Sequence, residues 1–278
     1  MIISISSGKG GTGKTTVAVN LALALDNAQL IDCDVEEPNA HILLKPKILE
    51  EKPVFAFYPS INENKCTYCG RCTELCQYNA IFVTQSGIMV FPELCHSCGL
   101  CVLACPEGAI SEERREIGII RKGIADGVDI VYGELNVGEP MAVPVIREVK
   151  KMIQKTKDVI IDVSPGASCP VVTSVYGSDF ALLVTEPTPF GLHDLKIAVE
   201  VLRMLQIPLG VVVNQAGIGD KKVYEYCEKE GIPIMLEIPF SRRIAELYSR
   251  GVPFTLKMIE WKDRFKQLFK NIKEQVNR

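Results

Sequence analysis

The chain has 278 residues, of which 47% are hydrophobic and 23% are charged, values that are ordinary for a globular protein of one or two domains. Its 31 basic and 34 acidic side chains give a formal net charge of −3, so neither nucleic acid nor an anionic membrane is an expected partner. No apolar segment approaches the roughly 18 residues of a membrane-spanning helix. The composition therefore excludes a disordered chain and an integral membrane protein.

The amino terminus predicts a cytoplasmic protein. Residues 1–7 lead directly into a glycine-rich loop, without the basic segment and cleavage site of a secretory signal. Thiols stay reduced in the cytoplasm and remain free to bind metals. We therefore expect most of the eleven cysteines to be metal ligands and not disulfides.

The first predicted elements are a strand at residues 2–5, a glycine-rich loop and an apolar helix through Val17, Leu21 and Leu25. The loop reads G-x-x-x-x-G-K-T, which between a strand and a helix is a phosphate-binding P-loop. Its N–H groups surround the phosphates, Lys14 reaches the β- and γ-phosphates, and the Thr15 hydroxyl reaches Mg²⁺. The expected nucleotide contacts are Gly8, Gly10, Gly11, Thr12, Gly13, Lys14, Thr15 and Thr16.

A second lysine, Lys9, opens this loop, so that residues 9–15 read K-G-G-x-G-K-T. This sequence resembles the deviant-Walker ATPase family that includes MinD, ParA, the Mrp-type ATPases and the nitrogenase iron protein. The resemblance implies a homodimer that forms on ATP binding, in which Lys9 crosses the interface to the partner's phosphates. The alternative for Lys9 is a solvated surface lysine.

The second predicted strand, residues 29–33, leads into Asp32-Cys33-Asp34. This D-x-D sequence is similar to switch I of the same family. The resemblance assigns Asp34 as the residue that orients the attacking water. For Asp32 we expect indirect support of Mg²⁺ or the capping of a helix.

Eight of the eleven cysteines form two sets that each read C-x2-C-x2-C-x3-C, the second starting 29 residues after the first, at Cys95 against Cys66. Such a repeat indicates one structural unit used twice. Three thiolates two residues apart bind one cubane, and the fourth reaches the other cluster. We therefore expect two [4Fe-4S] clusters, one bound by Cys66, Cys69, Cys72 and Cys105 and the other by Cys95, Cys98, Cys101 and Cys76.

Residues 61–111 thus resemble a bacterial two-cluster ferredoxin. One departure is Gln77, which stands where the second set has Pro106. Two zinc sites or disulfides are the alternatives. Zinc sites rarely use this spacing twice, and disulfides conflict with a reducing compartment.

This small α+β unit is expected to interrupt an ATPase domain formed by residues 1–60 and 112–278. Pro46, Pro53 and Pro59 predict a stiff linker that enters this unit. Residues 112–116 predict a charged linker that leaves it. Residues 118–152 are expected to form a loop and a helix at 145–153. Because switch I orders or relaxes with the γ-phosphate, a redox unit inserted after it is expected to respond to the nucleotide.

The carboxyl-terminal half alternates strands at 158–163, 180–185, 209–214 and 234–238 with helices at 192–205 and 220–230, which predicts a doubly wound, mostly parallel α/β sheet. Ligands of such sheets bind at the carboxyl ends of the strands. By resemblance, Asp162 in D-V-S-P-G belongs to switch II and holds Mg²⁺ through water, and the Gly166 N–H senses the γ-phosphate. Asn214 and Pro239 are similar to adenine contacts. The alternative for Asp162 is helix capping.

The last predicted helix has one apolar face and one basic face. We expect the apolar face to pack on the sheet. The alternative is membrane binding, as in the basic terminal helix of MinD. The apolar face consists of Trp261, Phe265, Leu268, Phe269, Ile272 and Val276.

The sequence predicts an ATPase that couples its ATP cycle to electron transfer through two [4Fe-4S] clusters, with an unidentified protein as electron donor or acceptor. Its cofactors are ATP or ADP, Mg²⁺ and the clusters, and its catalytic residues are Lys9, Lys14 and Asp34. One alternative is a MinD/ParA-like positioning ATPase with redox-sensing clusters. Another is an iron-sulfur or metallocofactor assembly ATPase, which the missing C-P-x-C pair disfavours.

Overall fold

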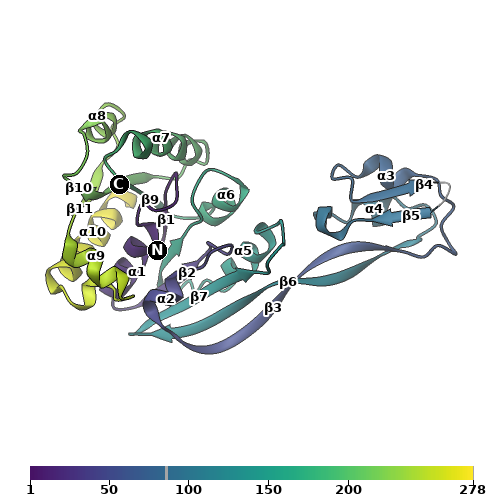
Figure 1. Ribbon diagram of the computed structural model, residues 1–278, viewed down its shortest axis with the longest axis horizontal. Helices are drawn as coiled ribbons and strands as arrows, with labels where there is room; N and C mark the ends of the chain where they lie inside the picture. Colours follow the sequence, from purple (N-terminus) through teal and green to yellow (C-terminus); the bar gives the residue numbers. More distant parts are fainter. Residues whose placement is uncertain (85–86, 278) are drawn as a thin grey trace.

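The structure is a computed structural model that describes residues 1–84 and 87–277 (Figure 1). The large sheet contains β1 (Ile2–Ser6), β2 (Ala28–Asp32), β3 (Lys47–Ile61), β6 (Ile110–Ala125), β7 (Val128–Leu135), β8 (Asp158–Asp162), β9 (Phe180–Thr185), β10 (Leu209–Ala216) and β11 (Ile234–Pro239). A separate hairpin contains β4 (Ile81–Thr84) and β5 (Gly87–Val90). The helices are α1 (Lys14–Ala24), α2 (Ala40–Leu44), α3 (Arg71–Leu75), α4 (Leu100–Ala104), α5 (Val143–Lys150), α6 (Cys169–Val175), α7 (Pro189–Met204), α8 (Lys222–Lys229), α9 (Arg242–Ser249) and α10 (Ile259–Val276), with 3-10 turns η1 (Pro92–Leu94) and η2 (Phe254–Leu256).

The large sheet has the strand order β11-β10-β9-β1-β8-β2-β7-β6-β3. Its first seven strands in this order run parallel, whereas β6 is antiparallel to β7 and β3 is antiparallel to β6. The predicted doubly wound, mostly parallel sheet is confirmed. All six strands predicted for it lie within two residues of the observed bounds.

Two apolar cores cover the two faces of the sheet. Alternate residues of the parallel strands point to opposite faces, so Ile160 of β8 lies in one core while Val159 and Ile161 lie in the other. Helices α1, α2, α9 and α10 cover the first face. Helices α5, α6, α7 and α8 cover the second. The sheet is therefore buried on both sides, and its strand ends are left free to form a site.

The apolar face of α10 packs inside the first core, as expected. Trp261, Phe265 and Leu268 are at most 4% exposed, and the helix contacts α1 and η2. The Phe254 and Trp261 rings meet edge to face, with centroids 5.4 Å apart. The face that the membrane alternative needs is thus occupied. No helix in the described part of the chain is long and apolar enough to cross a membrane.

Strands β3 and β6 form a long antiparallel arm (Figure 1). Their pairing continues beyond the last residue of β7, Leu135, which faces Gly118, and ends at the pair Ile61–Ile110. The expected proline linker and charged outgoing linker are therefore wrong, because both segments are strands. Pro53 and Pro59 are tolerated because β3 is the edge strand, where a missing N–H costs no ladder bond.

The loop expected within residues 118–152 is confined to residues 136–142, whereas the helix expected at 145–153 corresponds to α5. The second half of β6 and the whole of β7 occupy the rest of this region before α5 begins. These strands read G-I-I-R-K-G-I-A and V-D-I-V-Y-G-E-L, and their alternation was hidden by three glycines and a turn at residues 126–127.

The arm carries a small unit, residues 62–109, which we call the head (Figure 1). Its two halves repeat one design, because α3 and α4 each begin after a glycine, Gly70 or Gly99, with φ near 70°. Since β7 is parallel to β2, the arm leaves the sheet at the carboxyl ends of the parallel strands. The P-loop after β1 lies at this same edge.

Candidate functional site

A cavity of about 330 Å³ opens at the carboxyl ends of the parallel strands. Most of the predicted nucleotide contacts line it, from the P-loop, switch I and the ends of β10 and β11. Gly8, Thr12 and Gly166 lie outside its lining. The predicted residues that line it are Gly10, Gly11, Gly13, Lys14, Thr15, Thr16, Asp34, Asn214 and Pro239.

Lys14 is the charged centre of this site. Its Nζ lies 3.2 Å from Asp34 Oδ2 and 3.2 Å from Asp162 Oδ1, and all three side chains are buried or nearly so. Burial alone would lower the pKa of Lys14, but the charges of Asp162, Asp34 and Asp32 outweigh it and raise this pKa. The lysine is therefore held as a cation at the start of α1, where phosphate oxygens are favoured.

Asp162 has one unused oxygen. Its side chain is completely buried, and Oδ2 has no hydrogen-bond partner. Burial raises the pKa of Asp162, while Lys14 and Thr15 act in the opposite direction. The helix-capping alternative does not apply, because the next helix begins at Cys169 with Ser168 as its N-cap. A buried carboxylate oxygen without a donor, close to a threonine hydroxyl, fits a hydrated Mg²⁺.

Asp32 is a structural carboxyl. Its Oδ1 accepts the Asp34 N–H at 3.0 Å, and its Oδ2 accepts the N–H of Ala40, the first residue of α2, at 3.1 Å. Of the two roles expected for Asp32, the capping role is supported by this bond to the first N–H of α2, although Asn39 occupies the N-cap position. Burial and the neighbouring Asp162 carboxylate raise the pKa of Asp32 to about 8, against the effect of Lys14.

Asn214 and Gly166 hold the P-loop in this structure. Asn214 Nδ2 donates to the Thr12 carbonyl at 2.8 Å, and the Gly166 N–H donates to the Ser7 carbonyl at 2.9 Å. A Cβ on Gly13, whose φ is 90°, would lie 2.4 Å from Asn214 Nδ2. The P-loop is thus fixed from both sides of β1, and the contacts of these residues with nucleotide stay predictions.

Lys9 lies outside the cavity lining of its own chain. Its Nζ forms an ion pair with Glu186, which follows β9. It is therefore not a freely solvated lysine, and a reach toward a partner's phosphates stays a prediction. Glu186 had no signal in the sequence, since nothing local links it to Lys9.

Two exposed aromatic side chains on the cavity wall were not anticipated. Phe240 and Tyr248 line the cavity beside Pro239, and each is more than half exposed. Their large apolar surfaces are open to a ligand. An exposed tyrosine on α9 carries no sequence signal of its own, because its place on the wall depends on how α9 packs beside β11.

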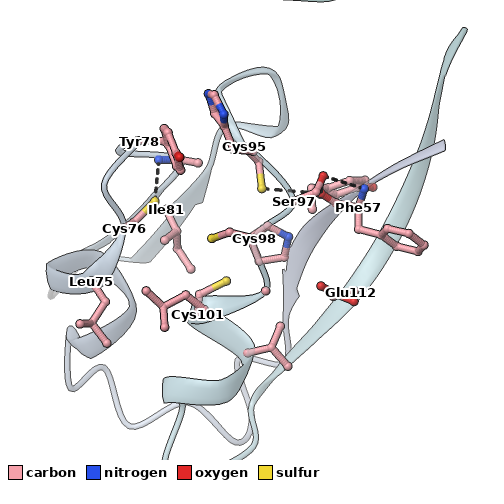
Figure 2. Close-up of a pocket in the computed structure, with 17 residues that line it drawn as sticks. Phe57, Leu75, Cys76, Tyr78, Ile81, Cys95, Ser97, Cys98, Cys101 and Glu112 are labelled. Carbon is pink, nitrogen blue, oxygen red and sulfur yellow. Dashed lines mark hydrogen bonds between the residues drawn. The ribbon is translucent and has the colours of Figure 1, made fainter. Parts of the chain in front are cut away.

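The cluster cysteines gather at two places in the head. Figure 2 shows the place next to the arm, where Cys76 from the first set joins three cysteines of the second. A second cavity brings Cys105 of the second set to three cysteines of the first. The structure thus assembles the two groups of four that the spacing predicts, which are Cys76, Cys95, Cys98 and Cys101, and Cys66, Cys69, Cys72 and Cys105.

Backbone N–H groups face one sulfur in each group. Across residues 1–84 and 87–277 no three His, Cys, Asp or Glu side chains are arranged to hold one metal ion. The N–H groups of Ala80 and Ala109 each lie 3.3 Å from a cysteine sulfur, of Cys76 and Cys105 respectively. Such donors stabilise sulfur charge and tune cluster potentials.

Burial makes three of the eight thiols harder to ionise when no metal binds them. Burial raises the pKa of Cys101 to about 11 and raises the pKa values of Cys95 and Cys72 as well. At Cys95 the positive charge of Arg115 acts against this rise. Iron must therefore displace protons when it binds these sulfurs.

The arm contacts the nearer cysteine group directly. The Phe57 N–H donates to Ser97 Oγ at 3.0 Å, and Ser97 Oγ donates to the Phe57 carbonyl at 2.6 Å (Figure 2). His96, in the same loop, stacks on Tyr78 with ring centroids 3.7 Å apart. The loop that carries Cys95 and Cys98 is thus attached to β3.

The fold and the nucleotide cavity define a P-loop nucleotide-binding protein. The chain belongs to the family described as the CobQ/CobB/MinD/ParA nucleotide binding domain, which matches residues 3–254.

Relatives extend over almost the whole chain. It is 33% identical to the uncharacterized protein MJ0579 of Methanocaldococcus jannaschii over 91% of each chain. It is 27% identical to the iron-sulfur cluster carrier protein of the same organism, covering 99% of this chain and 84% of the relative. Among solved structures, the septum site-determining protein MinD of Pyrococcus horikoshii, complexed with Mg-ADP, is similar in fold, with a TM-score of 0.60 at 21% identity over 98% of this chain and 95% of the other.

Proposed function

We infer that this protein is an ATP-hydrolysing iron-sulfur protein in which the ATP cycle controls electron transfer through two [4Fe-4S] clusters. One observation carries this inference above all. The arm extends from the sheet edge at which the nucleotide cavity opens, and it carries both four-cysteine groups at its end. Nucleotide and redox chemistry thus share one edge of one sheet.

The nucleotide site supports ATP hydrolysis. Lys14 neutralises charge on the β- and γ-phosphates, and Thr15 with Asp162 holds the hydrated Mg²⁺. Asp34, 9% exposed on the cavity lining, orients water for attack on the γ-phosphate. The nucleotide is also contacted by Asn214 and Pro239. The Gly166 N–H contacts it once its hydrogen bond to the Ser7 carbonyl has broken.

Dimer formation completes the site. Lys9 exchanges Glu186 for the phosphates of the partner subunit when two copies close over ATP. The family to which the chain belongs and its likeness in fold to MinD support this step. A partly buried ion pair within one chain keeps Lys9 positioned until a second copy arrives.

The cysteine groups support electron transfer. Each bound [4Fe-4S] cluster supplies a one-electron couple. The chain contributes four sulfurs to each group, backbone N–H donors to Cys76 and Cys105, and the apolar walls of both cavities. Because each group takes one ligand from the other cysteine set, bound clusters would sit within one small unit, where they would supply an electron path through the head.

A second candidate function is iron-sulfur cluster delivery. The similarity to an iron-sulfur cluster carrier protein over 99% of the chain favours it. It predicts that clusters leave the protein readily, whereas sites of four internal cysteines each retain theirs. Incubation with an apo-ferredoxin distinguishes the two, because only a carrier loses iron to the acceptor within minutes.

The proposal is tested by separating its two halves. The reconstituted chain should bind about eight iron atoms and hydrolyse ATP. Lys14→Ala should abolish hydrolysis and leave iron content unchanged, whereas Cys98→Ser should lower iron content and leave ATP binding unchanged. Cys169→Ser, an exposed cysteine outside the head, is the matched control. Equal ATPase rates with oxidised and with reduced clusters would contradict the coupling.

A further inference from the structure

The loop between β7 and α5, residues 136–142, lies where the ATPase body meets the head, and we call it the connector loop. It follows β7 directly, and its backbone is attached to the base of the arm. Asn136 donates its N–H to the Ile117 carbonyl at 2.9 Å and its side-chain amide to the Glu116 carbonyl at 3.2 Å. The connector loop therefore moves with β6.

One end of the connector loop is bound to switch I. The Leu135 N–H donates to the Val35 carbonyl at 2.8 Å, and Val35 follows Asp34 in the chain. Asp34 in turn is held by Lys14, whose Nζ has to turn toward phosphate when nucleotide binds. A change at Asp34 therefore acts on the backbone at the start of the connector loop.

The other end is bound to the segment after switch II. Helix α5 follows the connector loop, and its last residue, Lys150, donates to the carbonyls of Thr173, Ser174 and Tyr176 at 2.6 to 2.8 Å. These carbonyls terminate α6, the helix that follows Asp162. The connector loop is thus bonded directly to switch I, and it is connected to switch II only through α5 and α6.

Within the connector loop, Glu139 binds Arg115 of β6, and both side chains are largely buried. The same guanidinium donates through Nη2 to the Pro92 carbonyl at 3.3 Å. Pro92 begins η1, and Cys95 follows this turn. The Arg115 side chain therefore joins the connector loop of the ATPase domain to the η1 turn, which precedes Cys95.

We propose that Arg115 is a positioning residue that transmits the nucleotide state from the connector loop to the η1 turn, so that the cysteine group nearest the arm is the one that responds to ATP. This inference rests on the proposed function, and it assigns the contact that would connect the nucleotide site to the cysteine group. The planar guanidinium suits the role, because its donors are fixed relative to one another and a shift of Glu139 turns the contact with Pro92.

Hydrogen exchange of the reconstituted full chain tests this link. Amides 93–98 should exchange about fivefold more slowly with Mg²⁺ and a non-hydrolysable ATP analogue than with MgADP. Arg115→Gln should abolish this difference. The matched control is Arg114→Gln, which removes the same charge from the neighbouring residue, whose guanidinium lies 4.8 Å from the Phe55 ring centroid, away from the connector loop. This control should keep the difference.

Glu139→Gln provides a second variant that leaves the charge of Arg115 beside the cysteines. It should abolish the difference in hydrogen exchange as Arg115→Gln does. It should also abolish the nucleotide-dependent change in potential of the nearer cluster. In the unmodified protein we expect nucleotide to change the ratio of reduced to oxidised cluster threefold, which is about 30 mV for one electron.

The outcomes separate this inference from the proposed function. Loss of the nucleotide response in Arg115→Gln and Glu139→Gln, with the response kept in Arg114→Gln, supports the link. A response that is unchanged in Arg115→Gln and Glu139→Gln overturns the link and leaves the coupling intact. No response in the unmodified protein overturns both together. If Arg115→Gln fails to hold iron, Glu139→Gln alone decides.

Discussion

Three buried carboxyl groups share one buried lysine in the nucleotide site. Lys14 lies between Asp34 and Asp162, and Asp32 lies directly behind them. One cation cannot neutralise three carboxylates in a largely buried site. The site therefore holds either a proton, as the raised pKa of Asp32 shows, or Mg²⁺ with its nucleotide. Nucleotide binding is therefore expected to rearrange the charges of Lys14 and these three carboxyl groups.

Replacing Asp34 by alanine should separate binding from turnover. The P-loop, Lys14 and Asp162 remain, so ATP still binds. Hydrolysis should fall by about 100-fold or more, because the water loses the group that orients it. Calorimetric titration with ATP and a steady-state ATPase assay measure the two effects. Turnover at the unmodified rate would show that another residue orients the water.

The pKa of Asp32 predicts a dependence of stability on pH. A carboxyl whose folded-state pKa is raised from 3.8 to about 8 binds its proton more tightly in the folded state than in the unfolded state. Its contribution to stability is full below the unfolded value and is lost as the pH rises through about 8. Without nucleotide or Mg²⁺, the thermal midpoint should therefore fall between about pH 5.5 and about pH 8.

The control is the Asp32→Asn variant, whose thermal midpoint is measured over the same pH range. Its midpoint should fall less over this range, because the amide does not titrate. Equal slopes for the two proteins would mean that Asp32 is ionised in the folded state and that another group dominates the pH dependence.

At the scale of elements, some features were predictable because their signals are local. The parallel strands read as short apolar runs, and the P-loop needs only eight residues. The exchanged cysteine groups were predictable because the spacing within each set determines which sulfurs reach one cluster.

The arm was not predictable in this way. Pro53 and Pro59 are typical of linkers, and β3 is stable only because it pairs with β6, whose residues lie far along the chain. The Arg115–Glu139 pair joins residues on different elements and has no signal in either. Features that depend on which strands become neighbours could thus not be predicted from one sequence.

Exchange of ligands between the two cysteine sets leads to a specific expectation for the head. Cys105→Ser should remove a ligand from the cluster of the first set, although Cys105 belongs to the second. About four iron atoms should be lost, and the EPR signal of the cluster next to the arm should remain. Iron analysis and EPR of the reduced protein measure this.

Cys76→Ser should have the converse effect and is the matched comparison. Loss of the cluster next to the arm in Cys105→Ser would show that each set binds its own cluster, contrary to the arrangement of the sulfurs.

At the scale of the whole molecule, one sheet carries both the nucleotide cavity and the arm with the two cysteine groups. The P-loop, switch I and the base of the arm all lie at the carboxyl ends of the strands (Figure 1). The strands that bind nucleotide are buried on both faces and rigid, whereas the head is attached through two strands, Ser97 and Arg115. Such an arrangement allows a local change at the γ-phosphate to reach the head without rearranging the core.

Anaerobic redox titration of the reconstituted protein, monitored by EPR, tests the central claim most directly. It compares protein without nucleotide, with MgADP, and with ATP retained by the Asp34→Ala change. The account predicts that ATP shifts the potential of at least one cluster by about 30 mV or more, which is about 0.7 kcal/mol for one electron. Identical potentials and spectra in all three states would contradict it, because the clusters would then be independent of the ATP cycle.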